Sequence, residues 1–237
     1  MKIFEILPIK IAVFDCPDFL LKKYLQKAQD VLWKDLGDSR GFYNNKTEIG
    51  FGGEAKMKNG YGWTALDNKE CQDLFEWIDS CLEEVRKNFN LPFEKIKSTN
   101  AWINKQTNGG FHAPHDHPAS ILSGILYLTS QETGKTIFSN IDEWRNNIFI
   151  AGAFKRQMTA INSIAGKLVI FPSSLKHAVS SYKENKDRYT ISFNSFPDGE
   201  VGTITQGLKI STSNLEKNSQ QYIINIDNTN KISEVAL

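Results

Sequence analysis

From Ser98 onward the chain consists largely of short runs with β-strand character, and this pattern restricts the fold more than any other feature. The runs are rich in β-branched and aromatic residues, and turn residues such as Asn108-Gly109-Gly110 separate them. Many short strands at this spacing are typical of a β-sandwich or a jelly-roll barrel. The expected strands are residues 99–106, 121–129, 135–139, 167–171, 178–182 and 188–196.

The first third of the chain predicts one strand and two helices. The strand is expected within residues 3–14. Apolar side chains at helical spacing predict a first helix over 19–36, with Asp18 as its N-cap and Gly37 as its stop. A second helix is expected over 69–89, with one apolar face formed by Leu74, Phe75, Ile78, Cys81, Leu82 and Val85. The fold class predicted is therefore mainly β with N-terminal helices (α+β).

The organisation along the chain fits one domain. A length of 237 residues suits a single core with additions. Residues 1–97 would pack on the barrel, residues 98–197 would form it, and 198–237 would be a polar extension with strand-like pieces at 201–210 and 221–226. Residues 37–66 read as a long loop with one short strand around 56–63. Residues 140–157 interrupt the strand pattern, either as a flap over a site or as a long hairpin excursion.

Composition excludes some classes of protein. The net charge is +1, from 28 basic and 27 acidic residues, so no overall field favours nucleic acid or an anionic membrane. No apolar run approaches the length of a membrane-spanning helix. Glu5 and Pro8 disrupt the apolar start as a signal peptide. Three cysteines without a Cys-x-x-Cys pair indicate reduced thiols, so a cytoplasmic location is expected. Nothing in the sequence indicates the oligomeric state.

All four histidines of the chain lie in two places. His112, His115 and His117 share one short segment, and His177 follows the expected strand 167–171. A single histidine is most often a hydrogen-bonded core or surface residue, but solvation alone does not explain this clustering. Strand alternation places His115 and His117 on one side and Asp116 on the other. The pattern predicts a mononuclear metal site, with two ligands from one strand end and one from a later strand.

Arg188 opens the apolar strand 189–193. A guanidinium at the inner start of a buried strand requires an anion, and a carboxylate bound in bidentate fashion is the natural one. No obvious protein partner is present in the sequence, so a ligand carboxylate is attractive. The alternative is an ordinary surface arginine at a strand end, which follows the charged run 183–187.

These residues resemble the Fe(II)- and 2-oxoglutarate-dependent oxygenases, which have a double-stranded β-helix, a jelly roll of the cupin type. The run from His115 to Gly124 is similar to the pattern His-x-His-Pro-x-Ser-x-Leu-Ser-Gly of a branch common in phages and marine bacteria. The likeness covers about residues 98–196, and the N-terminal helices loosely. Further similar segments are Asn100-Ala-Trp-Ile-Asn104, Ile125-Leu-Tyr-Leu128, Thr133-Gly-Lys-Thr-Ile-Phe138 and Gly166-Lys-Leu-Val-Ile-Phe-Pro-Ser173.

The resemblance implies Fe(II), with 2-oxoglutarate and O2 as cosubstrates. It implies that Arg188 pairs with the 5-carboxylate of 2-oxoglutarate. The other residues that it places at the cosubstrate are Tyr127, Thr190, Ser192 and Asn104. The implied reaction is oxidative decarboxylation of 2-oxoglutarate to succinate, coupled to hydroxylation of a second substrate. A peptidyl residue is the leading candidate for that substrate, by analogy with prolyl and aspartyl hydroxylases.

One departure from the family pattern concerns His117, which stands where most members carry Asp or Glu. His115, His117 and His177 could together bind the iron, Asp116 could turn inward, or His117 could lie in the second shell and leave an open position. Strand alternation disfavours Asp116, so three histidine ligands are preferred. His112 is expected to be a second-shell or surface residue.

Other functions remain open at this point. Three histidines also suit a cupin-type metalloprotein that does not use 2-oxoglutarate, such as a dioxygenase or an isomerase. Arg188, Tyr127 and the segment around Thr136 argue against it. A non-catalytic binding domain on the same barrel would not need convergent histidines.

Overall fold

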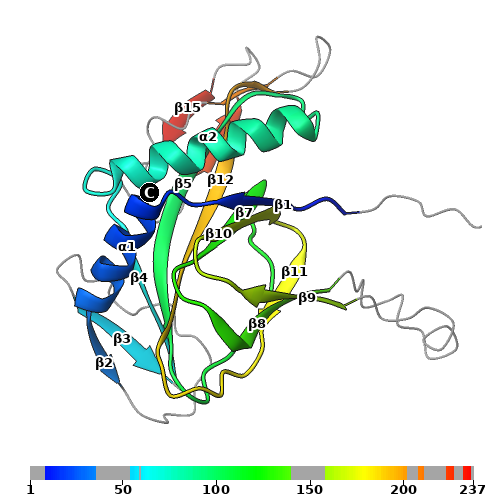
Figure 1. Cartoon of the computed structure of the whole chain (residues 1–237). Coiled ribbons are helices and arrows are strands. Elements are labelled where there is room, and N and C mark those ends of the chain that lie inside the picture. The colour runs from blue at the N-terminus through cyan, green and yellow to red at the C-terminus, as the bar shows by residue number, and fades with distance from the viewer. Residues whose placement is uncertain are drawn as a thin grey trace, which may run out of the picture.

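The protein is described by a computed structural model that covers residues 9–35, 54–58, 60–139, 158–201, 208–210, 223–226 and 232–235. Over these residues it has two helices and three sheets (Figure 1). The expectation for residues 140–157, a flap or a hairpin excursion, lies outside the described residues. None of the described helices is long and apolar enough to cross a membrane.

The largest sheet contains nine strands, and its neighbours are antiparallel except for the pair β2 and β3. Across the sheet the order is β1 (Ala12–Asp15), β10 (Lys167–Pro172), β7 (Leu122–Tyr127), β12 (Arg188–Val201), β5 (Phe93–Gln106), β4 (Tyr61–Ala65), β3 (Glu54–Lys58) and β2 (Leu32–Asp35), with β13 (Leu208–Ile210) paired to β12.

A second sheet of four strands has the order β6 (His112–His115), β11 (Lys176–Val179), β8 (Gln131–Ser139) and β9 (Met158–Ser163). A hairpin of β14 (Ile223–Ile226) and β15 (Ile232–Val235) forms the third. The first two sheets share an apolar interior, in which Ile125 and Phe171 of the large sheet pack with Phe138 of the small one. This arrangement confirms the jelly-roll prediction.

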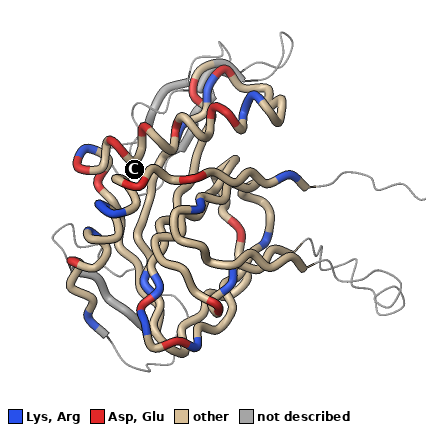
Figure 2. Tube along the Cα trace, in the orientation of Figure 1, with Lys and Arg blue, Asp and Glu red and all other residues tan. Residues whose placement is uncertain are grey.

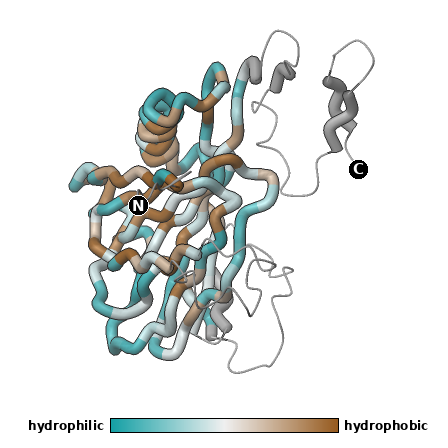
Figure 3. Tube along the Cα trace, turned by 90° about the vertical axis from the view of Figure 1, so that its right-hand side faces the viewer, coloured by the Kyte–Doolittle hydropathy of each residue, from teal (hydrophilic) through white to brown (hydrophobic). Residues whose placement is uncertain are grey.

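The two helices cover the other face of the large sheet. They are α1 (Asp18–Asp30) and α2 (Gln72–Asn88), and every residue of the predicted apolar face of α2 is buried. The side of α2 turned toward the sheet is hydrophobic, and its outer side is hydrophilic (Figure 3). Alternation along β7 explains how one strand serves two cores, because Leu126 packs under the helices and Ile125 points between the sheets.

Charged residues are mixed along both helices and the loops of the barrel (Figure 2). Lys23 bonds Asp73 at 2.6 Å and thereby links the two helices. Both side chains are substantially exposed, so this pair contributes little to stability. The mixture agrees with the near-neutral net charge.

The N-terminal third corrects several sequence predictions. The first helix ends at Asp30 rather than near residue 36, because Val31 is extended (φ −64°, ψ 129°) and Leu32–Asp35 pairs with β3 instead. The N-cap is Pro17 rather than Asp18, and no side chain caps this helix end. Within the described part, the first strand occupies only Ala12–Asp15. The short strand expected at 56–63 is a hairpin of two strands, β3 and β4.

The barrel strands agree better with the sequence. The six expected runs correspond to β5, β7, β8, β10, β11 and β12, with shifted ends. Strands β6 and β9 were not predicted. Of the two strand-like pieces in the extension, 201–210 contains β13 and 221–226 contains β14.

Gly124 lies where the ring of Phe193 crosses β7. A Cβ atom at this position would be 2.3 Å from two ring carbons of Phe193, whose side chain is fully buried. Gly124→Ala should therefore destabilise the protein by about 1–3 kcal/mol through overpacking, measured by denaturant unfolding. In the Phe193→Leu background the same substitution should cost clearly less. An equal cost in both backgrounds would show that the ring is not the cause.

Candidate metal centre

Three histidine rings converge between the two sheets. His115 at the end of β6 pairs with His177 of β11, and His117 follows β6 by two residues. One ligand atom from each of the three lies within 4.8 Å of the others. The backbone N–H of His117 donates to the carbonyl of Ser173 at 3.0 Å, which fastens its segment to the turn before β11. The fold thus brings together the three residues that the sequence singled out.

Hydrogen bonds orient two of these rings. Nδ1 of His177 lies 3.0 Å from the Leu175 carbonyl, and Nδ1 of His115 lies 2.8 Å from the Ala113 carbonyl. A carbonyl only accepts, so Nδ1 carries the proton in both rings and Nε2 keeps its lone pair for a metal. Backbone partners of this kind are typical of histidines that bind metals. The donor geometry therefore fits a divalent cation.

His117 completes the cluster. Its Nε2 lies 3.2 Å from Nε2 of His177, a distance at which the two nitrogens can share one proton or bind one cation. Its ring also hydrogen-bonds the side chain of Asn194, whose Oδ1 accepts from the Ser123 hydroxyl at 2.9 Å. A second polar layer therefore supports this ring as well.

Burial keeps these rings neutral. It lowers the pKa of His177 to about 3 and that of His117 to about 4, with neighbouring His115 adding to both shifts. The pKa of His115 is lowered by burial too. Neutral imidazole is the form that binds a metal, so the cluster is in its ligating state at neutral pH.

The two other candidates near this cluster behave differently. The side chain of Asp116 is exposed, and the described groups with metal-site geometry do not include it. His112 was expected in a second shell or at the surface. Its ring lies 4.0 Å from that of His115 and stacks on Tyr61 at 4.8 Å in the same pocket, a position beside the ligands that agrees with this expectation. Burial lowers the pKa of His112 to about 3.

Arg188 lines the same pocket and is almost fully buried, with 2% of its surface exposed. Its Nε donates to the Ser163 hydroxyl at 3.1 Å, and its NH1 donates to the side-chain amide oxygen of Gln106 at 2.7 Å. Its NH2 is buried without a hydrogen-bond partner. The alternative, an ordinary surface arginine, is therefore wrong.

No carboxylate offsets this charge among the described residues. Burial lowers the pKa of Arg188, and the groups that oppose this shift are tyrosines, led by Tyr127. A buried guanidinium with an unused donor is costly unless an anion pairs with it. The charge and the unused donor of Arg188 therefore suit a ligand carboxylate.

Strand register explains why polar residues connect Arg188 with the histidines. Alternate residues of a strand face the same side, so Asn104 and Gln106 of β5 lie opposite Thr190 and Arg188 of β12 on the inner face. The Asn104 amide donates to Thr190 at 3.2 Å and to Ser192 at 2.9 Å. Asn104, Thr190 and Ser192 all line the pocket, as the resemblance implied.

Tyr127 has another position than expected. The resemblance implied that its hydroxyl meets the cosubstrate, but this hydroxyl donates to Thr136 at 2.7 Å. Its ring lies under the guanidinium, with 5.7 Å from Cζ of Arg188 to the ring centroid. Tyr127 is not among the residues that line the pocket. In this structure it supports Arg188 from below.

Several residues of the site were not predicted from the sequence. Tyr61 of β4 donates to the Asn104 amide oxygen at 2.6 Å, and Trp102 is tilted against His117 at 5.9 Å. Gln106 and Ser163 hold Arg188. Trp102 and Asn104 share one segment of the family likeness, which was the only available signal. The other residues can be recognised only once the strand register is known.

The space between these side chains is small. The pocket that the histidines, Arg188 and Ser192 line holds about 30 Å³, which is room for an ion and about one water. Binding of a larger molecule therefore requires side chains at the pocket to move apart.

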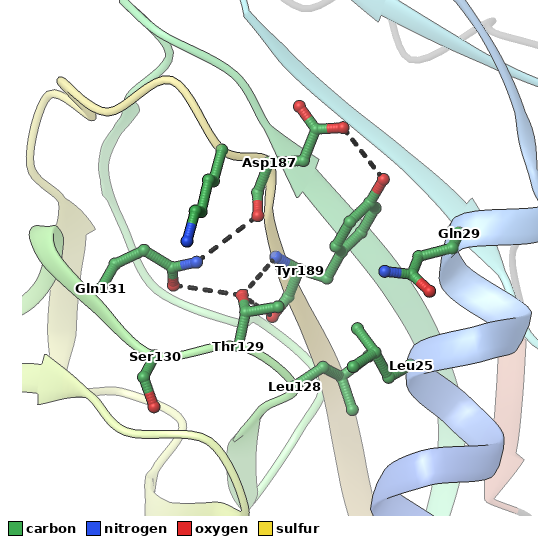
Figure 4. Close-up of a pocket in the computed structure, with 9 residues that line it drawn as sticks. Leu25, Gln29, Leu128, Thr129, Ser130, Gln131, Asp187 and Tyr189 are labelled. Carbon is green, nitrogen blue, oxygen red and sulfur yellow. Dashed lines mark hydrogen bonds between the residues drawn. The ribbon is translucent and has the colours of Figure 1, made fainter.

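A larger and more open hollow lies beside α1, between Leu25, the segment 128–131 after β7 and the start of β12 (Figure 4). Its polar groups bond one another, as when Thr129 donates to Gln131 and Gln131 donates to the Asp187 carbonyl. It contains no histidine and no buried unpaired donor. Size alone would favour it, but the groups suited to chemistry are at the histidine pocket.

Residues 100–194 match the family model described as putative 2OG-Fe(II) oxygenase. This range contains the three histidines, Arg188 and the strands between them. No curated protein matches the chain significantly.

Solved structures share the fold at low sequence identity. A Pseudomonas putida prolyl-4-hydroxylase is 14% identical, with a TM-score of 0.52, over 81% of this chain and 94% of that one. HygX from Streptomyces hygroscopicus, with nickel and 2-oxoglutarate bound, is 11% identical, with a TM-score of 0.52, over 80% and 83% of the two chains. A Trichoplax adhaerens prolyl hydroxylase in complex with a hypoxia inducible factor peptide is 15% identical, with a TM-score of 0.50, over 79% and 83%.

Proposed function

We propose a specific site for the activity of this chain. Its residues 100–194 match the 2OG-Fe(II) oxygenase family, and the chain is thus an Fe(II)- and 2-oxoglutarate-dependent oxygenase. In this proposal His115, His117 and His177 bind the iron, and Arg188 binds the 5-carboxylate of 2-oxoglutarate. The observation that carries it is one pocket with a neutral three-histidine cluster and a buried guanidinium that has an unused donor.

The residues of the chain have separate tasks in this proposal. Leu175 and Ala113 hold the Nδ1 protons of His177 and His115 through their carbonyls, so that both rings present Nε2 to the metal. Asn104, Thr190 and Ser192 form the polar wall along which the cosubstrate would lie. Ile125 and Phe171 of the large sheet, with Phe138 of the small one, seal the interior below against water.

Fe(II) and 2-oxoglutarate, when bound, supply the oxidative chemistry: one O2 is consumed, 2-oxoglutarate becomes succinate and CO2, and the substrate gains one hydroxyl group. Three neutral ligands leave the site one positive charge higher than two histidines and a carboxylate would. The dianionic cosubstrate suits this excess, together with the charge of Arg188.

We further propose a peptidyl residue as the substrate. The support is analogy with two enzymes of similar fold: the Pseudomonas putida prolyl-4-hydroxylase and the Trichoplax adhaerens prolyl hydroxylase, which is seen with a peptide. Tyr61, Trp102 and His112 are half-buried at the pocket and present aromatic surface to an incoming chain. A cytoplasmic location belongs to this proposal too, supported by three buried free cysteines.

Succinate release tests the function. Protein loaded with Fe(II) under oxygen should convert 2-oxoglutarate to succinate, and a peptide substrate should accelerate this and gain the mass of one oxygen atom. Proline-containing peptides and their alanine counterparts are the first pair to compare. The His177→Ala protein is the control and should release none. Absence of succinate from wild-type protein would refute the function, whereas succinate without any peptide product would refute only the substrate class.

The three-histidine ligand set favours one second candidate, a cupin-type metalloprotein independent of 2-oxoglutarate. That candidate offers no role for the unused donor of Arg188. It predicts metal binding without any 2-oxoglutarate affinity, and this outcome would make it the better account.

A further inference from the structure

Gln106 is the side chain that holds NH1 of Arg188. The two face each other in the register of β5 and β12, and Gln106 is fully buried. A guanidinium only donates hydrogen bonds, so the Gln106 oxygen must be the atom that faces NH1, at 2.7 Å. The amide orientation is thereby fixed, and Nε2 points elsewhere, buried and without a hydrogen-bond partner.

The other contacts of Arg188 are also neutral. Ser163 accepts from Nε, and the face of the Tyr127 ring lies near the guanidinium carbon. Among the described residues, none of the ion pairs involves Arg188. A glutamate has nearly the same shape as glutamine and would form a buried ion pair at this position. The chain instead carries an amide, which holds the guanidinium without neutralising it.

We propose that Gln106 is a positioning residue: it fixes the fork of Arg188 and, because it is neutral, leaves the positive charge for the distal carboxylate of a 2-oxo dicarboxylic acid. This inference rests on the proposed function, in which Arg188 binds 2-oxoglutarate. It assigns to Gln106 the preference for dicarboxylic over monocarboxylic 2-oxo acids. If residue 106 served only to stabilise the fold, glutamate would be the better residue, because its carboxylate would satisfy Arg188 better than the amide of glutamine does.

The test compares Gln106→Glu with Gln106→Met, which has a similar length and no hydrogen-bonding head group. Each protein is loaded with Mn(II) without oxygen and titrated calorimetrically with 2-oxoglutarate. The second probe is 2-oxobutyrate, which has the 2-oxo acid end and no distal carboxylate. Thermal unfolding and Mn(II) affinity are measured in parallel, because neither should fall in Gln106→Glu.

The glutamate variant should bind 2-oxoglutarate on the order of 100-fold more weakly than wild type, since its own carboxylate occupies and neutralises Arg188. The methionine variant should lose only about tenfold, the effect of one hydrogen bond that positions the fork. Affinity for 2-oxobutyrate should be the same in all three proteins.

Wild-type affinity for 2-oxoglutarate in Gln106→Glu would overturn the inference and leave the proposed function intact. So would a methionine variant as weak as the glutamate one, because geometry rather than charge would then control binding. A parallel loss of 2-oxobutyrate affinity would show general damage and would overturn it too. Absence of 2-oxoglutarate binding in wild-type protein would overturn the proposed function itself.

Discussion

Replacement of His177 by alanine should abolish stoichiometric metal binding. The structure places its Nε2 at the centre of the cluster, 3.2 Å from Nε2 of His117, with Nδ1 held by the Leu175 carbonyl. Removal of one of three ligands should lower the affinity for Fe(II), Mn(II) or Co(II) more than about 100-fold, because second-shell changes alone cost about 10–100-fold. Metal content of purified protein and calorimetry with Mn(II) measure this, and circular dichroism checks the fold.

The matched control is His112→Ala. His112 is half-buried in the same pocket and its ring lies 4.0 Å from that of His115, but it is not one of the three convergent ligands. This variant should keep one metal per chain, and so should Asp116→Ala. His117→Asp restores the carboxylate that most of the family carries and should preserve binding. Loss of metal in Asp116→Ala, or full metal content in His177→Ala, would contradict the ligand assignment.

Replacement of Arg188 by alanine should weaken 2-oxoglutarate binding by about 3–5 kcal/mol, several hundred-fold or more. The guanidinium is buried, has an unused NH2 donor and has no carboxylate partner among the described residues. Arg188→Lys should recover only part of the affinity, since an ammonium cannot reproduce the fork. Calorimetry on Mn(II)-loaded protein measures both variants, and Mn(II) affinity should hardly change.

Two other variants are controls that test whether the loss of 2-oxoglutarate affinity is specific to Arg188. Lys105 is a cation on the neighbouring strand β5 that bonds Asp187 at 2.8 Å, away from the pocket. Lys105→Ala should leave 2-oxoglutarate affinity unchanged. Tyr127→Phe should cost much less than Arg188→Ala, because the Tyr127 hydroxyl bonds Thr136 and the ring that supports Arg188 is kept. Normal binding by Arg188→Ala, or an equal loss in Lys105→Ala, would contradict the role of Arg188.

The core of the fold could be predicted from the sequence because its strands are strongly patterned. Residues 168–171 are apolar throughout, and this part of β10 is buried on both faces between the helices and the small sheet. Local signals failed where tertiary pairing decides. The segment Leu32–Asp35 extends the helical spacing of the residues before it, yet it becomes a strand because β3 is available beside it.

The site was predictable in part. Alternation correctly placed His115 with His117, but alternation alone does not explain why His112, three residues upstream of His115, also lines the pocket. Strand β6 pairs His115 with His177 and His112 with Val179, so three intervals on β6 oppose two on β11. This bulge turns His112 toward the same pocket. A bulge depends on the partner strand, and the sequence of β6 alone contains no sign of it.

Arg188 also shows the limit of prediction from local sequence patterns. Its need for an anion follows from the sequence, because it begins an apolar strand. Its neutral partners Gln106 and Ser163 come from strands 82 and 25 residues away along the chain. Only the register of β12 with β5 brings Gln106 opposite Arg188. Residues that act through such cross-strand contacts cannot be found from local patterns.

The most direct test is a crystal structure of the wild-type protein with Mn(II) and 2-oxoglutarate, with the metal located by its anomalous scattering. The account predicts one peak in contact with Nε2 of His115, His117 and His177. It also predicts the distal carboxylate of 2-oxoglutarate on NH2 of Arg188, the donor that has no protein partner. A metal bound through Asp116, or a 2-oxoglutarate whose distal carboxylate lies away from Arg188, would contradict it.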